Sequence, residues 1–515
     1  MSKLFLFGIG GTGARVIRSF TMMLAAGFQG IDSSVEIVPI ILDHDKGNGD
    51  LDRAKKALDA YHSINKGLYP DAGNGTTVYK DSFFVPRVTP LSQVGVNNGP
   101  ANINWHVQFG EVAAKSNMKY SDYIGLSTIA ANPNLEATAS LIECLYDDSQ
   151  SNDPNAELNL ELDKGFKGNP SIGTVVFNEL KDDASFKSFL NNCNPGNGDR
   201  VFIVGSIFGG TGSSGIPVIV DEIRKSKIGI VNQTPIGVAL VLPYFKLQPK
   251  QPGCTEDTGA IDCALFNAKT KAALGAYGIG GASSFNQKVT DLYYIGDVYT
   301  DAYEYHEGNN KQQNPAHVVE WVAATAIVDF LQNQDLFGTN KVKEYGVMSE
   351  GNTKAIDMPE ISEKSRQMFV DDLSAFVFAM RYYLEVVCGT RNKIKDSTAF
   401  FNTFDLSNKL KSGDYDKVKQ FVQNNLWGFY KWLEELEQHS HAFKPYCLEG
   451  KGKDLGNILS HKTVGGGFLS RNPATDDNVS GKINNLTKNT TDSSPRGFFK
   501  ALHDASVEVI DKIKK

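Results

Sequence analysis

Two glycine-rich segments carry the clearest chemical signal in the sequence. The first, Gly8-Ile-Gly-Gly-Thr-Gly13, follows an apolar stretch at Leu4–Phe7, and the second, Gly209–Gly215, follows an apolar stretch at 200–205. A helical pattern comes after each, so each segment is expected to present backbone N–H groups and the positive end of a helix next to the end of a strand. This arrangement binds an anion without any lysine, and a phosphate chain is the ligand that suits it best.

The first glycine segment alone also fits the G-x-G-x-x-G pattern of dinucleotide-binding proteins. In that class an acidic residue about 20 positions further on binds the ribose, whereas Asp43 stands 30 positions after Gly13. A nicotinamide-dependent oxidoreductase therefore stays open as an alternative, although we find no catalytic residue for one. A P-loop is excluded because G-x-x-x-x-G-K-[ST] does not occur in the sequence. Either glycine segment taken singly would also fit a structural turn.

Strands and helices are expected to alternate around these loops. Besides the strand at Leu4–Phe7, strands are expected at 35–42, 200–205, 237–242 and 291–295. This order predicts an α/β fold, a Rossmann-like parallel sheet with helices on both faces. The segment Val318–Leu331 is apolar on nearly every side, and Asn314 with Pro315 is suited to begin its helix. We expect this helix to lie buried in the middle of the fold.

The domain division expected from the sequence has two parts. Residues 1–340 form a nucleotide-binding domain, in which 46–160 is a large insertion of uncertain fold. Residues 341–515 form a mainly helical C-terminal domain, and the polar stretch 450–496, rich in Gly, Asn, Ser and Thr, is expected to be flexible.

Composition narrows the class of partner. The net charge of −7 is spread along the chain, and no clustered basic face is evident, so nucleic acid is not an expected partner. The apolar runs fall short of the roughly 20 residues of a membrane-spanning helix. The six cysteines are scattered without a CxxC pair, which predicts reduced thiols in a cytoplasmic protein and no metal site built from cysteine.

Several segments, in the right order, resemble the FtsZ/tubulin superfamily. Phe208-Gly-Gly-Thr-Gly-Ser-Ser-Gly-Ile-Pro217 is similar to the GGGTGTGAAP signature of FtsZ, with Phe208 in place of a small residue and Ser214 in place of a glycine. The segment 8–13 resembles the first phosphate loop of the family, and Asp43-His-Asp45 resembles the loop after the second strand.

Three further segments extend the resemblance over residues 1 to about 340. Gly168-Asn-Pro-Ser-Ile-Gly173 is similar to the GNPEIG loop of FtsZ that senses the γ-phosphate. Leu242-Pro-Tyr-Phe245 resembles the TKPF strand end, and Phe266-Asn-Ala268 resembles the YNA of tubulin, whose Asn contacts guanine. The helix after Asn314 would be the central helix of the family, which carries a second base-contacting side chain.

The resemblance implies binding of GTP or GDP, with Mg²⁺. The guanine contacts rest on Asn267 and Asn314 by resemblance only, so adenine stays open. Asp43 or Asp45 would support the metal through water, and His44 between them is expected to be a loop residue rather than a ligand. The residues implied to contact the nucleotide are Gly8, Gly10, Gly11, Thr12, Gly13, Asp43, Asp45, Gly168, Asn169, Gly173, Gly209, Gly210, Thr211, Gly212, Ser213, Asn267 and Asn314.

The resemblance also implies that hydrolysis is completed by a neighbouring subunit in a head-to-tail filament. Asn333-Gln-Asp-Leu-Phe337 is similar to the NxDF start of the FtsZ catalytic loop, so Asp335 is the candidate for polarising water, although Gly338 stands where a second acid is expected. Asp335 would equally fit a solvated loop acid. Glu320 is a weaker candidate and would also fit a paired carboxylate or one at the rim of the site. The other hypothesis is a nucleotide-binding scaffold or switch that forms no filament and binds a protein partner through the insertion or the C-terminal helices.

Overall fold

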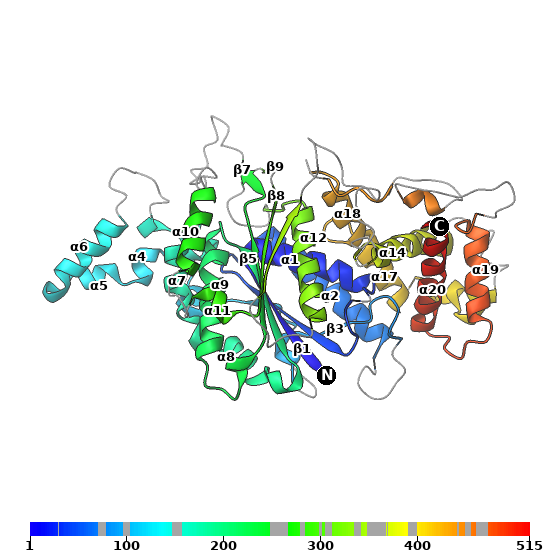
Figure 1. Ribbon diagram of the computed structural model, residues 1–515, viewed down its shortest axis with the longest axis horizontal. Helices are drawn as coiled ribbons and strands as arrows, with labels where there is room; N and C mark the ends of the chain where they lie inside the picture. The colour runs from blue at the N-terminus through cyan, green and yellow to red at the C-terminus, as the bar shows by residue number, and fades with distance from the viewer. Residues whose placement is uncertain are drawn as a thin grey trace.

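The computed structural model describes most of the chain (Figure 1). The described residues are 1–28, 30–70, 79–95, 103–146, 157–247, 266–278, 284–297, 301–303, 312–333, 341–347, 367, 369–389, 399–411, 413–439, 442–448, 455–459 and 472–514.

A parallel sheet forms the centre of the molecule. Its strands follow the order β10-β8-β6-β5-β1-β2-β3, and β4 pairs with the end of β2. The bounds are β1 Ser2–Ile9, β2 Val35–Leu42, β3 Arg87–Val88, β4 His106–Val107, β5 Arg200–Ser206, β6 Ile236–Val241, β8 Asp291–Asp297 and β10 Lys341–Val347. The predicted α/β class is confirmed, as are the five predicted strands. A separate small sheet pairs β7 (Phe245–Leu247) with β9 (Asp301–Tyr303).

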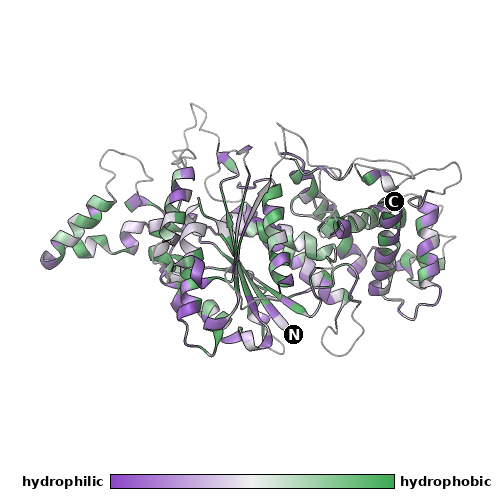
Figure 2. Ribbon diagram, viewed as in Figure 1, coloured by the Kyte–Doolittle hydropathy of each residue, from purple (hydrophilic) through white to green (hydrophobic). Residues whose placement is uncertain are grey.

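The two faces of the sheet are covered by two different hydrophobic cores. Along β1, Leu4 and Leu6 point into one core, while Phe5, Phe7 and Ile9 point into the other, because successive side chains of a strand point to opposite faces. Figure 2 shows how apolar residues dominate the central strands.

The helices divide between these faces (Figure 1). The first face packs against α1 (Gly10–Ala25), α2 (Gly49–Leu68), α12 (Val318–Gln332) and the C-terminal helices. The second face packs against α7 (Pro170–Phe177), α8 (Ala184–Asn192), α9 (Gly210–Lys225), α10 (Phe266–Gly278) and α11 (Phe285–Lys288). The sheet is therefore buried on both sides, as all-parallel sheets generally are.

The stretch expected to be an insertion at 46–160 is only partly one. Its first part contains α2, which packs on α1, and the two-residue strands β3 and β4, which extend the sheet next to β2. This part belongs to the sheet domain because its apolar residues, such as Leu58 and Tyr61, fill the first core.

A second part of that stretch projects from the second face of the sheet (Figure 1). It consists of α3 Gly110–Ala114, α4 Tyr120–Tyr123, α5 Leu126–Ala130 and α6 Glu136–Leu145. Leu141 and Leu145 of α6 are exposed over 58% and 68% of their area.

The C-terminal region is mainly helical, as expected, but it shares its core with the sheet. Its described helices are α14 Asp371–Tyr382, α15 Ala399–Thr403, α16 Leu406–Lys409, α17 Gly413–Gln423, α18 Phe429–Leu436, α19 Asp476–Thr487 and α20 Pro495–Lys514. Phe376, Trp432 and Phe498 lie in the same core as the residues of α1 and α12. The expected boundary at residue 340 is therefore not a boundary between cores, and β10 continues the sheet beyond it.

Part of the polar stretch expected to be flexible is helical. Thr475 caps α19 by accepting the N–H of Asn478, and Val479 and Ile483 are buried against the core. Val479 and Ile483, with the small and buried Ser480, are enough to anchor a helix whose composition is otherwise polar.

Two helix starts also differ from the expectation. α12 begins at Val318 and is capped by His317 rather than Asn314, because the Nδ1 of His317 accepts the N–H of Val319. α9 begins at Gly210, so the second glycine segment forms the first turn of the helix instead of a loop before it.

The two longest described helices, α2 and α20, have 20 residues each, and charged side chains interrupt both. In the described part of the chain, no helix combines the length and the apolar character that crossing a bilayer requires.

Candidate functional site

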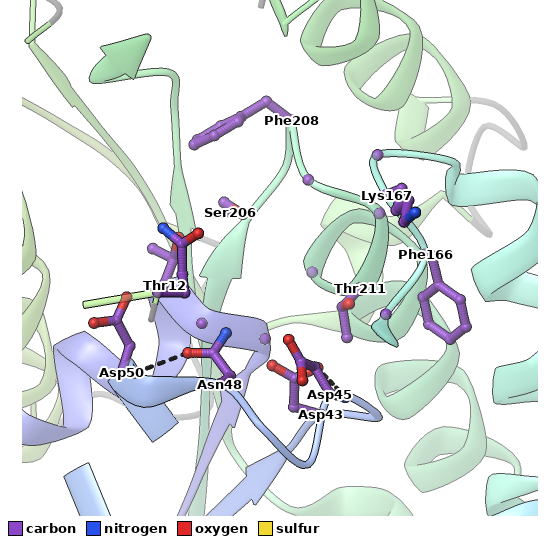
Figure 3. A pocket seen from close by; sticks show the side chains of 18 of the residues that line it. Thr12, Asp43, Asp45, Asn48, Asp50, Phe166, Lys167, Ser206, Phe208 and Thr211 are labelled. Carbon is purple, nitrogen blue, oxygen red and sulfur yellow. Dashed lines mark hydrogen bonds between the residues drawn. The ribbon is translucent and has the colours of Figure 1, made fainter. Parts of the chain in front are cut away.

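A pocket of about 200 Å³ opens beyond the carboxyl ends of β1 and β5 (Figure 3). These neighbouring strands mark the place where the strand order reverses, since the chain moves outward to β2 from β1 and returns to the other side at β5. In open parallel sheets, ligands bind at such a reversal because the two adjacent loops diverge there.

The first glycine segment forms one wall of the pocket. Gly10 adopts a φ of +69°, a conformation that favours glycine, and α1 starts there. A Cβ atom at Gly13 would lie 2.5 Å from the carbonyl carbon of Gly8 and 2.8 Å from the carbonyl oxygen of Val204, so α1 rests directly on β1 and β5. No side chain of the described residues caps this end of the helix. Its first N–H groups, in residues that line the pocket, remain available to a ligand.

The second glycine segment faces the first. α9 starts at Gly210 without a side-chain cap in the described structure, and a Cβ atom at Gly212 would collide with the carbonyl oxygen of Ser206. The two segments touch, because a Cβ atom at Gly10 would lie 3.3 Å from the Cβ of Thr211. Two helix N-termini thus converge on one pocket, and their partial positive charges add.

A third loop, 164–169, closes the pocket beside the second glycine segment. A Cβ atom at Gly210 would lie 2.8 Å from the Cβ of Phe166 and 3.0 Å from the backbone nitrogen of Gly168. The loop continues into α7, which packs so closely on α9 that a Cβ atom at Gly173 would collide with the Oγ of Ser214. Lys164 and Lys167 of this loop line the pocket.

Carboxylates line the floor. Asp43 and Asp45 come from the turn after β2, and the N–H of Asp45 donates to Asp43 Oδ1 at 3.2 Å. Burial, and then the charge of Asp45, raise the pKa of Asp43 to about 7. Burial raises the pKa of Asp45 as well. His44 does not join them, because its ring packs against Phe109 and burial lowers its pKa to about 3. The expectation that His44 is not a ligand agrees with this position.

Aromatic side chains form the wall opposite the lysines. Phe208, Phe245 and Phe266 all line the pocket, and the ring of Phe208 lies 5.4 Å from that of Phe245 and 4.8 Å from that of Phe266. These rings belong to the core on the first face of the sheet, whereas Phe166 of the lysine loop belongs to the core on the second face. The pocket is therefore lined by aromatic rings from one face of the sheet and by the lysine loop from the other, and the Cζ of Arg15 lies 5.9 Å from the ring centroid of Phe245.

A network of buried ion pairs and hydrogen bonds around Arg15 lies next to the pocket. The Nη1 of Arg15 donates to Asp50 Oδ2 at 2.7 Å, its Nε to Glu320 Oε1 at 2.5 Å, and its Nη2 to Tyr244 at 2.7 Å. Burial alone would raise the pKa of Glu320, but the charge of Arg15 holds that pKa below its ordinary value. Glu320 is thus a paired structural carboxylate, as its second interpretation proposed, and it is not among the residues that line the pocket.

Most residues implied by the family resemblance meet at this pocket. Those that line it are Gly10, Gly11, Thr12, Asp43, Asp45, Gly168, Gly209, Gly210, Thr211, Gly212 and Asn314. Those that lie just behind it and shape the loops are Gly8, Gly13, Asn169, Gly173 and Ser213.

Two predicted residues are not brought to the pocket. Asn267 is exposed on α10 and does not line the cavity, whereas its neighbour Phe266 does. Asp335 lies outside the described residues.

Several lining residues were not identified from the sequence. They are Arg15, Asn48, Asp50, Lys164, Lys167, Phe245, Phe266 and Gln312. Asn48 could have been predicted as a helix cap, because it directly precedes a charged helical stretch. Its Oδ1 does accept the N–H of Asp50 at 2.8 Å. Lys164 and Lys167 are not part of a recognisable sequence motif, because they lie on the loop 164–169 and not in either glycine segment.

Among the described residues, a cluster of Asp301, His317 and His439 resembles a metal site. The carboxylate of Asp301 lies 3.4 Å from the Nε2 of His317 and 3.4 Å from the Nδ1 of His439. However, the Nδ1 of His317 accepts the N–H of Val319, which assigns the proton of the neutral ring to Nε2, the atom that would bind the metal. His317 would have to give up the cap of α12 to coordinate. The cluster is therefore better described as a hydrogen-bonded one.

No protein-family model matches the sequence, and no curated protein shows significant similarity to it.

Proposed function

We propose that the chain binds a purine nucleoside polyphosphate, with guanine as the expected base, in the manner of the FtsZ/tubulin superfamily. The observation that carries the proposal is the convergence of two uncapped helix N-termini, at Gly10 and Gly210, on one pocket at the strand-order reversal. Amides at two helix ends suit a ligand with more than one phosphate, because each end can hold a separate anionic group.

In this proposal, the aromatic rings and the glycine segments determine which way round the nucleotide binds. The base lies toward Phe208, Phe245 and Phe266, where flat apolar rings suit it, and the phosphates lie between the glycine segments. The buried side chain of Asn314 lines the pocket and accepts a hydrogen bond from Gln312 Nε2 at 2.6 Å. This pair supplies amide groups that can bind the edge of a base. The family resemblance, and not the geometry, favours guanine over adenine.

A magnesium ion fits the floor of the pocket. Asp43 and Asp45 offer oxygen donors, which Mg²⁺ prefers. Burial, and then the charge of Asp45, raise the pKa of Asp43, and a bound cation would favour its ionised form. When bound, Mg²⁺ would also offset the charge of the phosphates. Asp43 and Asp45 would hold it directly or through water.

Hydrolysis is proposed to depend on a second copy of the chain. α12 has 15 residues and is about 22 Å long. It starts near the pocket, and Asn333 after its end is bound to Asp291 and Arg200, the first residues of β8 and β5. The pocket lies at the other ends of the strands. The residues directly after Asn333, which include Asp335, lie outside the described structure, and the end of α12 is remote from the pocket of its own chain. A head-to-tail contact would bring this segment to the pocket of the next copy, and such contacts form open filaments.

A direct titration tests nucleotide binding. Gly11→Asp places a carboxylate in the first turn of α1, where it is compatible with the helix. The nearest atoms to a Cβ there are Asn48 Nδ2 at 3.2 Å and Arg15 Nη1 at 3.7 Å, both hydrogen-bond donors, so we expect the variant to fold. Repulsion between this carboxylate and a phosphate should weaken GTP and GDP binding about 100-fold or more.

The matched control for this titration is Gly481→Asp in α19, where a Cβ atom meets nothing within 4 Å. The control should bind both nucleotides like the wild type in calorimetric titrations with Mg²⁺. Equal affinity of Gly11→Asp and the wild type would reject the pocket as the site. Binding of NAD in preference to GTP would instead support the oxidoreductase alternative.

A further inference from the structure

A second pocket, of about 220 Å³, lies between α2, the segment before α12 and the C-terminal helix α18. It is separate from the pocket at the glycine segments, because no residue lines both. Its lining is mainly polar and includes Arg53, Lys431, Glu435 and the amide side chains of Gln313, Asn425 and Gln438.

The two pockets share one wall, the segment that leads into α12. Gln312 and Asn314 line the pocket at the glycine segments, while Gln313 and Pro315 line the second pocket. Consecutive residues of this segment therefore alternate between the two pockets. A shift of the segment on one side would move lining residues on the other side as well.

Arg53 connects the second pocket to the backbone of this wall. It lines the second pocket, and its Nη2 donates both to the carbonyl oxygen of Asn314 and to Asp50 Oδ1. Asp50, which lines the first pocket, accepts the N–H of Asn314 at 3.0 Å. Arg53 and Asp50 together hold the backbone of a residue whose side chain lines the first pocket.

The second pocket offers a ligand more positive than negative charge. Arg53 and Lys431 line it, against the single carboxylate of Glu435. Both oxygens of that carboxylate are already used, because Oε1 accepts from Arg53 and Oε2 accepts from Arg18 and from the N–H of Ala316. A ligand therefore meets donors and positive charge at this wall.

The two buried guanidinium groups beside the pocket have more donors than acceptors. In the described part of the chain, the Nε of Arg53 and the Nη2 of Arg18 are buried without a hydrogen-bond partner. Burial lowers the pKa of Arg18, the charge of Glu435 raises it, and the charge of Arg53 lowers it further. A negative charge nearby would stabilise both groups, and an oxyanion supplies that charge together with several acceptors.

Lys431 is the cation that a ligand can reach most easily. It is 30% exposed, and its partner Glu434 lies 3.6 Å away at a position that is 55% exposed. An exposed pair of this kind contributes little to stability, so Lys431 can turn to a ligand at small cost.

We infer that the second pocket binds a small oxyanion, the phosphate or carboxylate group of a small molecule, with Lys431 and Arg53 as its cations. An anion there draws Arg53 toward itself and away from the backbone of Asn314, and so weakens nucleotide binding in the first pocket. The anion site does not rest on the proposed nucleotide binding, whereas its effect on the nucleotide does.

Calorimetric titrations with inorganic phosphate and with malonate, at constant ionic strength, test the anion site. Gly11→Asp is the background for them, because its carboxylate opposes phosphate binding at the glycine segments. We expect binding, and the anion that binds more tightly shows whether the site prefers phosphate or carboxylate. Lys431→Gln in this background should weaken the binding about 10-fold or more, as expected for the loss of one charge-assisted hydrogen bond. Lys431→Arg should retain it.

Lys444→Gln is the matched control. Lys444 is 56% exposed, lies 3.8 Å from Glu437 and does not line the pocket. Its replacement in the same background should leave anion binding unchanged. A loss with Lys431→Gln alone would therefore locate the anion in the second pocket.

Titrations with GTP test the effect on the nucleotide. The anion that binds more tightly should weaken GTP binding to the wild type about 5-fold or more. In Lys431→Gln this weakening should be much smaller. Any weakening that persists in that variant reports direct competition at the glycine segments.

The outcomes separate this inference from the proposed function. If Gly11→Asp binds neither anion, or binds it equally well with Lys431→Gln, the anion site is overturned whether or not the wild type binds nucleotides. If the anion binds through Lys431 but leaves GTP binding unchanged, the link between the pockets is overturned. A wild type that binds no nucleotide rejects the proposed function, while the titrations of Gly11→Asp still decide on the anion site.

Discussion

His317 makes the start of α12 depend on a side chain that titrates. Its Nδ1 accepts the N–H of Val319 at 3.1 Å, and the backbone N–H of His317 donates to Glu320 Oε2 at 3.1 Å. Burial, with a contribution from His439, lowers the pKa of His317 below its ordinary 6.5, while Asp301 and Glu320 act in the opposite direction. Protonation of Nδ1 would remove the acceptor that caps the helix.

Because of His317, the free energy of unfolding should decrease as the pH is lowered. Because the folded state binds the proton more weakly than the unfolded state, the contribution of His317 is complete above pH 6.5 and is lost as pH falls below it. His317→Asn keeps a capping acceptor but does not titrate. The stability advantage of wild type over this variant in urea unfolding should shrink between pH 8 and pH 5, by at most about 1.4 kcal/mol per pH unit. An advantage that is constant with pH would contradict the role of the cap.

At the level of residues, sequence reasoning found those lining residues of the pocket that depend on the backbone. Gly10 and Gly212 were predicted because a strand, a glycine run and a helix are contiguous in the chain. Lys164 and Lys167, which line the same pocket, were not, because their loop is close to the second glycine segment only in space. Asn267 shows the converse, since a three-residue match with tubulin did not fix which side of α10 faces the pocket.

At the level of elements, α18 is tied to the N-terminal helices by one carboxylate. Glu435 accepts from Arg18 of α1 and from Arg53 of α2, each at 2.7 Å, and from the N–H of Ala316 at 3.0 Å. The side chains of Arg18, Arg53 and Glu435 are all buried. Arg53 also pairs with Asp50, which lines the pocket. The C-terminal helices are therefore linked by ion pairs to the floor of the proposed site.

Neutralising this carboxylate should destabilise the whole protein. Glu435→Gln leaves two buried guanidinium groups without their shared negative charge, which should lower the free energy of unfolding by about 3 kcal/mol. Glu434→Gln, one residue earlier, removes an exposed carboxylate that lies 3.6 Å from Lys431 and should cost less than about 0.5 kcal/mol. Chemical denaturation of both variants measures the difference. Equal effects would show that the buried network does not hold α18 in place.

The strands next to the glycine segments were predictable because each is a single apolar run bounded by a turn. β3 and β4 were not, because a two-residue strand has no periodicity of its own and forms only where β2 offers a free edge. The shared core of the C-terminal helices escaped prediction for a related reason. An amphipathic pattern such as that of Phe429, Trp432 and Leu436 shows which side of a helix is buried, but not what covers it.

At the level of the whole molecule, α12 runs along the sheet from the carboxyl ends of the strands, where the pocket lies, to their amino ends. The pocket lies at the carboxyl edge, while Asn333 is held at the amino edge by Asp291 and Arg200. Under the proposed function, the segment that follows α12 would therefore act on the pocket of a neighbouring copy.

The size of the assembled particles should therefore depend on which nucleotide is bound. The wild type with Mg²⁺ and GTPγS should sediment as large particles, and with GDP it should sediment mainly as a small species. Gly11→Asp, which is expected to lose nucleotide binding, should stay small in both conditions. A wild-type protein that binds guanine nucleotides but stays small in every condition would favour the scaffold or switch that forms no filament.

The central claim is that the pocket between Gly10 and Gly210 holds a purine nucleoside polyphosphate. The most direct test is to denature the purified protein and identify by chromatography the small molecules that it releases. The proposed function predicts GDP or GTP in the wild-type sample and a much smaller amount from Gly11→Asp purified in parallel. Release of NAD, or of no nucleotide from wild-type protein that also binds none in titration, would contradict the claim.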